Sequence, residues 1–168
     1  GAGHEGGLRA GTENVAQIAG LGAACAMAAA DIEANRRHLQ SMRNRLLHGL
    51  REKLAHHPGL RINTPLQQAL PNTLNLSING IRAADLMTRL EQDLACSAGS
   101  ACHTDSVNLS PVLTAMGIPE QDILGALRLS TGRMTTEEEI DAAVISISHA
   151  AKEIHAFAPT QSMGAREQ

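Results

Sequence analysis

The sequence predicts an α/β fold in which helices cover a small sheet. Leu74, Leu76 and Ile78 alternate with polar residues, as expected for a half-buried strand. Amphipathic segments with helical spacing lie on both sides of this strand in the sequence. The expected order is two helices, two strands and then helix–strand–helix–strand–helix, with no internal repeat. A mixture of this kind buries the apolar faces of its helices against a sheet.

The core is expected to be aliphatic, because Trp and Tyr are absent and Phe157 is the only aromatic residue among 168. A chain of this length suits one domain, or one domain with an appendage. Binding of single-stranded nucleic acid relies on aromatic stacking, which this composition cannot supply. The net charge is −3, and the arginines at 36, 37, 43 and 45 are spaced as on a helix surface. We therefore expect no nucleic-acid partner.

Membrane, secretory and metal-binding functions are not predicted. No apolar run approaches membrane-spanning length, and no signal peptide opens the chain. Three cysteines are an odd number, which does not suit a disulfide framework, so a cytoplasmic location is expected. Cys96 and Cys102 lack the Cys-x2-Cys spacing of a zinc site.

The individual elements follow from apolar periodicity and from capping residues. Ser110 and Pro111 are suited to start a helix, and Thr136 with Glu139 forms a capping box. Helices are expected at residues 15–30, 31–54, 83–92, 110–117, 119–124 and 136–157. Strands are expected at residues 60–63, 70–78, 94–96 and 127–130.

The N-terminal stretch, residues 1–14, carries five of the 15 glycines. Glycine-rich loops that enter a helix can bind phosphate through backbone N–H groups, and Thr12 is a good N-cap. A flexible linker is the alternative interpretation. A domain seldom begins inside such a loop, so we expect the chain to be the latter part of a longer protein.

Residues 96–104 form a small, polar stretch that holds two of the three cysteines. A run of Ser, Ala and Gly predicts a loop, and Cys102 at its distal end is expected to be accessible, as a reactive thiol must be. The alternative is a cysteine that only packs. Cys96, next to the expected strand, is predicted to pack.

Five segments of the sequence form a series of motifs that extends almost to Asp141. They are residues 6–14 (GGLRAGTEN), 70–75 (LPNTLN), 97–102 (SAGSAC), 110–117 (SPVLTAMG) and 127–141 (LRLSTGRMTTEEEID). Together they resemble the pyridoxal-phosphate-dependent cysteine desulfurases, in which the motifs occur in the same order. The closely related selenocysteine lyases share much of the pattern, including a Cys-His pair after the Ser/Ala/Gly run.

The resemblance implies three site residues. Cys102 matches the catalytic cysteine, which takes the substrate sulfur as a persulfide. Arg128 matches the arginine that holds the substrate carboxylate, and a planar guanidinium suits that task. Thr12 matches the threonine that reaches the phosphate of the partner subunit's cofactor, pyridoxal 5'-phosphate. His103 either aids deprotonation of Cys102 or is a bystander.

The sequence departs from the family in two respects. The cofactor lysine and the large domain are missing, and the only lysines are Lys53 and Lys152. The resemblance therefore covers the small C-terminal domain of a fold-type I transferase. Residues 1–14 would belong to the missing large domain, residues 15–158 would form the small domain, and residues 159–168 a disordered tail. Alone, the chain is expected to be inactive.

Three functions remain open from the sequence. The first is a cysteine desulfurase that acts on L-cysteine, forms a homodimer in its complete form and delivers sulfur to an acceptor such as an iron–sulfur scaffold. The second is a selenocysteine lyase. The third is a non-enzymatic persulfide carrier or interaction domain, which would need Cys102 but neither Arg128 nor Thr12. The presence of both favours the first two.

Overall fold

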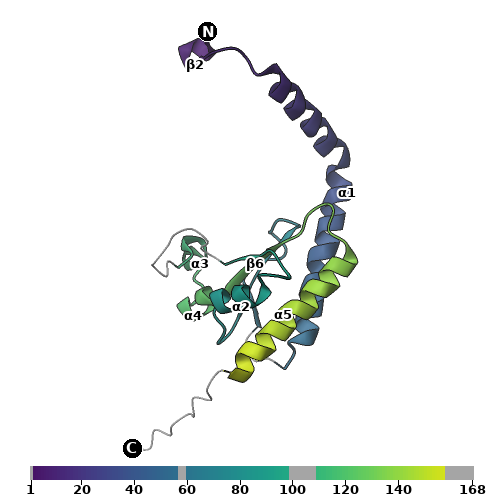
Figure 1. The fold of residues 1–168 in the computed structure, drawn as a ribbon, viewed down its shortest axis with the longest axis vertical. Helices are drawn as coiled ribbons and strands as arrows, with labels where there is room; N and C mark the ends of the chain where they lie inside the picture. The colour runs from purple at the N-terminus through teal and green to yellow at the C-terminus, as the bar shows by residue number, and fades with distance from the viewer. Residues whose placement is uncertain (1, 57–59, 99–108, 158–168) are drawn as a thin grey trace, which may run out of the picture. The chain divides into compact units, whose positions relative to one another are not determined.

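The structure, a computed structural model, describes residues 2–56, 60–98 and 109–157. The chain divides into two compact units, Gly1–Arg36 and Arg37–Gln168, and the division falls inside one long helix. Figure 1 shows the elements in chain order. Each unit is considered separately below.

The first unit begins with a small hairpin. Strands β1 (Gly3–His4) and β2 (Arg9–Ala10) pair in antiparallel fashion across the 3-10 turn η1 (Glu5–Gly7). Helix α1 (Val15–Lys53) follows, and Asn14 Oδ1 accepts a hydrogen bond from the Gln17 N–H at 3.2 Å. Asn14 is therefore the N-cap, and the prediction of Thr12 in this role was wrong.

Helix α1 is a single helix of 39 residues, whereas two helices were predicted at 15–30 and 31–54. The segment contains no proline, and Asp31 leaves the helical hydrogen bonds intact. Apart from the adjoining residues and the helix's own backbone, no described atom lies within 4 Å of a Cβ added to Gly20 or Gly22. The Val15–Arg36 part exposes its apolar side chains, each by at least 56%: Val15, Ile18, Leu21, Met27 and Ile32.

Helix α1 is also long and apolar enough to cross a membrane by length and composition. An 18-residue window has a mean hydropathy of 1.6, and none of it is buried. The prediction that no apolar run approaches this length was wrong, because the alanine-rich start of α1 contains almost no charge. Core helices share this composition, so it does not by itself indicate a membrane.

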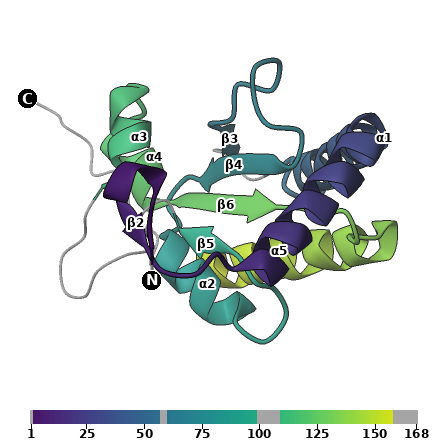
Figure 2. The same ribbon diagram turned by 90° about the horizontal axis from the view of Figure 1, so that it is seen from above.

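The second unit is built on a four-stranded antiparallel sheet in the order β3-β4-β6-β5, visible in Figure 2. The strands are β3 (Leu60–Ile62), β4 (Thr73–Ile78), β6 (Ala126–Ser130) and β5 (Ser97–Ala98). The third strand was predicted at 94–96. It lies instead in the first residues of the Ser/Ala/Gly run, because an edge strand needs only backbone hydrogen bonds to its neighbour.

Three helices cover one face of this sheet. They are the C-terminal half of α1, α2 (Ala83–Leu90) and α5 (Glu137–Phe157), and Figure 1 shows α5 alongside this half of α1. The predicted alternation is confirmed. The fully buried side chains of this core include Leu50, Leu74, Leu76, Leu86, Leu127 and Ile147.

Helix α5 is tied to α1 at its start. Thr136 Oγ1 accepts from the Glu139 N–H at 3.3 Å and Glu139 Oε2 accepts from the Thr136 N–H at 2.9 Å, so the predicted capping box is confirmed. The Arg45 guanidinium donates to both oxygens of Asp141, at 2.8 and 2.7 Å, and this bond holds the pKa of the Asp141 carboxyl below its ordinary value.

Two short helices cover one end of the opposite face. Helices α3 (Pro111–Ala115) and α4 (Glu120–Leu124) form a small cluster through Leu113, Ile123 and Ala126. Ser110 Oγ accepts from the Leu113 N–H at 3.4 Å, which confirms the predicted N-cap. After α4, a Cβ on Gly125 would lie 2.7 Å from the Ile81 carbonyl oxygen and 3.0 Å from that of Ile78, the last residue of β4, so the chain approaches the end of β4 closely here.

Candidate functional site

A row of polar residues crosses the part of the second face that α3 and α4 leave open. Asn75 of β4 is directly opposite Arg128 of β6, and Ser97 of β5 is opposite Arg128 on the other side. Directly opposed residues share one face of an antiparallel sheet. Their neighbours Leu74, Leu76, Leu127 and Leu129 point into the core. Arg128 is exposed, so its charge is available on this face.

A hydrogen-bond network holds Asn75 in place. The buried Asn63 donates from Nδ2 to Asn75 Oδ1 at 2.8 Å and to Ser77 Oγ at 2.7 Å. The Asn75 N–H donates to Thr64 Oγ1 at 2.6 Å. The backbone and the side chain of Asn75 are both fixed beside Arg128.

An ion pair borders this row on the α4 side. Arg61 Nη1 of β3 donates to Asp122 Oδ2 of α4 at 3.0 Å. The Asp122 side chain is only 9% exposed, and that of Arg61 is 43% exposed. The pair joins α4 to the edge of the sheet and so anchors the segment that follows residues 99–108.

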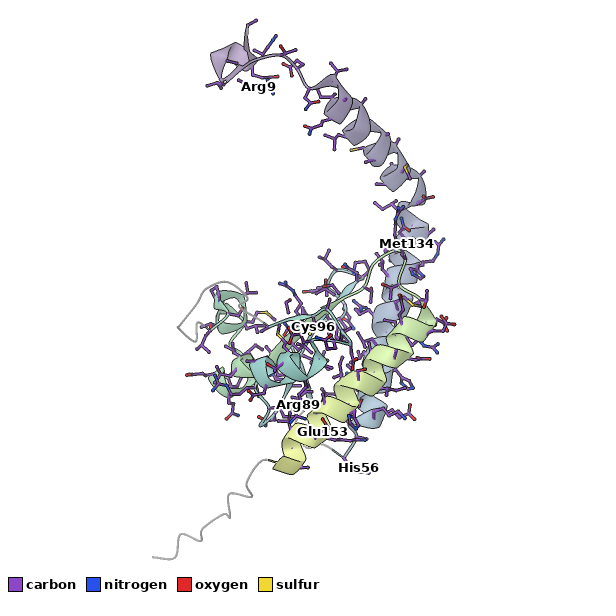
Figure 3. All side chains as sticks on the ribbon, in the orientation of Figure 1. Arg9, His56, Arg89, Cys96, Met134 and Glu153 are labelled. Atoms are coloured by element: carbon purple, nitrogen blue, oxygen red, sulfur yellow. The ribbon has the colours of Figure 1, made fainter. Side chains whose placement is uncertain are left out.

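Of the two cysteines at 96 and 102, the structure describes only Cys96. Cys96 is half-buried against the core, and this burial raises the pKa of its thiol. Figure 3 labels it beside the sheet. The prediction that Cys96 packs is confirmed. Cys102 and His103 lie outside the described residues, and Cys102 follows Ser97 of the polar row by five positions in the sequence.

Thr12 belongs to the first unit. It is exposed, and its carbonyl oxygen accepts from Arg9 Nη1 at 3.3 Å. Within the described parts of the second unit, the structure brings Arg128 together with Asn75 and Ser97.

Both lysines line one pocket of about 260 Å³ at the C-terminal ends of α1 and α5. Lys53 and Lys152 share it with His56 and His155. These helices pack on the leucine-bearing face of the sheet, whereas Arg128 lies on the opposite face. The residues that the structure describes therefore place no lysine in the polar row, and they do not fit a Schiff base with pyridoxal phosphate there.

No local sequence pattern indicated a role for four residues in or beside the polar row: Asn75, Asn63, Arg61 and Asp122. The alternation in β4 indicates that Asn75 is on the face away from the leucines. Its partner in the row, Arg128, is 53 positions later in the sequence (128 − 75). The two residues become neighbours only because β4 pairs with β6, and no local pattern specifies that pairing.

The comparisons agree with the fold and the motifs. A family model described as aminotransferase class-V matches residues 2–143. The cysteine desulfurase IscS of Vibrio vulnificus strain CMCP6 is 39% identical over 163 residues, which cover 97% of this chain and 39% of that protein. The cysteine desulfurase IscS of Salmonella schwarzengrund is 41% identical over 144 residues, 86% of this chain and 34% of that protein.

Two solved structures have the same fold. A NifS-like protein matches 94% of this chain and 38% of its own, with a TM-score of 0.74 and 34% identity. A NifS-like protein from Rickettsia africae matches 90% of this chain and 39% of its own, with a TM-score of 0.67 and 29% identity. The chain belongs to the aminotransferase class-V family, and it spans about 39% of the length of the Vibrio relative.

Proposed function

We propose that the chain is the C-terminal portion of a cysteine desulfurase that uses pyridoxal 5'-phosphate. The observation that carries this proposal is the exposed Arg128 in the polar row of the sheet. Ser97 is paired with Arg128 in this row, and Cys102 follows Ser97 by five positions in the sequence. This arrangement offers a cation for the substrate carboxylate close in the sequence to a thiol that can accept sulfur. The similarity to the cysteine desulfurases supports both roles.

In this proposal, Arg128 binds the carboxylate of L-cysteine through charge-assisted hydrogen bonds and so orients the substrate. The bound cofactor supplies an electron sink at the substrate's α-carbon. The Cys102 thiolate attacks the substrate sulfur, an S–S bond forms and the C–S bond breaks. The carbon retains the electron pair of the broken bond and takes up a proton, so L-alanine leaves and Cys102 carries the persulfide.

The larger part of the enzyme, which this chain does not span, would hold the cofactor. Residues 1–14 would belong to that part, and Thr12 would reach the cofactor phosphate in the partner subunit of a homodimer. Residues 15–158 would form the small domain. The chain alone would be inactive, because its lysines lie on the other side of the sheet from Arg128. The complete enzyme would act in the cytoplasm and pass sulfur to an acceptor protein.

Substitutions in the complete enzyme test the proposal. Cys102→Ser should abolish sulfide and alanine production from L-cysteine, because a hydroxyl cannot accept sulfur as a persulfide. Cys96→Ser is the matched control and should remain active, with some loss of stability from the half-buried hydroxyl. Arg128→Ala should raise KM for L-cysteine while the cofactor stays bound, as its absorbance reports. An active Cys102 variant with an inactive Cys96 variant would overturn the assignment.

A further inference from the structure

We propose that Asn75 is a second carboxylate-binding residue beside Arg128, and that Asn63 orients the Asn75 amide for this purpose. This inference rests on the proposed function, in which Arg128 binds the substrate carboxylate. It adds a neutral hydrogen-bond donor from β4 to the charged donor on β6.

The sheet register places the two side chains next to each other. Asn75 and Arg128 are directly opposite in the β4–β6 ladder, and such pairs have Cβ atoms about 4.5–5.5 Å apart on the same face. Arg128 is exposed and Asn75 is half-buried, so a ligand that approaches this face from solvent meets both.

The hydrogen bonds of Asn75 decide which end of its amide is available. Its Oδ1 accepts a hydrogen bond from Asn63 Nδ2, which also donates to Ser77 Oγ. Asn63 is buried, with 5% of its surface exposed. Asn63 thus uses both hydrogens of its Nδ2, on Asn75 Oδ1 and Ser77 Oγ, while its buried Oδ1 has no partner among the described residues. With Asn63 in this orientation, a reversed Asn75 amide would turn its NH2 group toward the Asn63 NH2 group. Asn75 Nδ2 therefore stays outside this network and makes no hydrogen bond within the described residues.

A carboxylate has more acceptor positions than one arginine occupies. Its two oxygens offer about four lone-pair sites, and a bidentate guanidinium uses two of them. The side-chain Nδ2–H of Asn75 can take a third. Because Asn75 carries no charge, it adds a contact without repelling Arg128, and a carboxylate is the ligand chemistry that suits this pair.

The test compares ligands with and without a carboxylate in the complete enzyme. Asn75→Asp is nearly isosteric, and its new carboxylate still accepts from Asn63, but it replaces the N–H donor with an acceptor that repels the substrate. We expect KM for L-cysteine and the inhibition constant of the product L-alanine to rise about ten-fold or more. The inhibition constant of cysteamine, which lacks the carboxylate, should not rise. Asn75→Ala should act in the same direction.

Asn79→Asp is the matched control, because it makes the same chemical change at an exposed position just after β4. It should leave all three constants unchanged. A merely structural role of Asn75 would weaken cysteamine as much as L-alanine. Such a uniform loss, or a result for Asn75→Asp equal to that of Asn79→Asp, would overturn the inference.

Arg128→Ala separates this inference from the proposed function. If it leaves KM for L-cysteine and the inhibition constant of L-alanine unchanged, the carboxylate site itself is wrong and both proposals fall. If it raises both constants while Asn75→Asp does not, only the role of Asn75 is overturned.

Discussion

The ion pair between Arg61 and Asp122 should stabilise the protein more than a comparable surface pair. The two atoms Arg61 Nη1 and Asp122 Oδ2 are 3.0 Å apart, and the Asp122 side chain is 9% exposed. Arg89 and Glu153 form a matched pair between α2 and α5, with Nη1 and Oε2 2.7 Å apart. Both arginine side chains are 43% exposed, but Glu153 is 41% exposed and also lies 3.7 Å from His149 Nδ1, so its carboxylate is far less buried than that of Asp122.

Arg61→Ala would leave the Asp122 carboxylate buried without its charge partner. Leaving a buried polar group unsatisfied costs about 1–3 kcal/mol. Loss of a fully buried pair costs about 3–5 kcal/mol, and the partial exposure of Arg61 places this case below that range. Arg89→Ala breaks an exposed pair, which is worth about 0–1 kcal/mol.

Urea unfolding of this chain measures the difference. Arg61→Ala should lower the free energy of unfolding by about 1–3 kcal/mol, and Arg89→Ala by no more than about 1 kcal/mol. Asp122→Asn added to Arg61→Ala should recover part of the loss, because a neutral amide is cheaper to bury than an unpaired carboxylate. Equal losses for the two arginine variants, or no recovery in the double variant, would refute this reasoning.

Two further predictions concern the packing of α1 and the chemistry of Cys96. A Cβ on Gly49 would lie 2.8 Å from Val144 Cγ2 of α5, so Gly49→Ala should destabilise the chain by about 1–3 kcal/mol despite its better helix propensity. Thermal unfolding should show that Val144→Ala suppresses this loss, and purely additive effects would contradict the contact. Burial raises the pKa of Cys96, and only the thiolate is alkylated, so its alkylation should reach half its maximal rate at higher pH than that of free cysteine. A midpoint at or below that of free cysteine would exclude this effect.

Local patterns were sufficient for many elements of the fold. Strand β3, the alternation in β4, helix α2 and the caps at Ser110 and Thr136 were predicted correctly. Each depends on residues within a few positions of one another, so the sequence alone determines them. The resemblance to the cysteine desulfurases likewise came from motifs that are contiguous in the sequence.

Where distant segments compete with local preference, the predictions failed. Arg43 was placed on a helix surface, but it is buried and donates to the Leu70 carbonyl oxygen at 3.1 Å. The β5 strand moved to Ser97–Ala98 because pairing with β6 outweighs the weak strand preference of small residues.

The polar row was decided only by the tertiary structure. The sequence singled out Arg128, but Asn75 and Ser97 become its neighbours through the β4–β6 and β5–β6 ladders. The orientation of Asn75 depends further on Asn63, which β3–β4 pairing brings to it. Two strands can pair in many registers. Burial of the leucine side chains selects one register, because a shift of β4 by a single residue would turn its leucines from the core toward solvent.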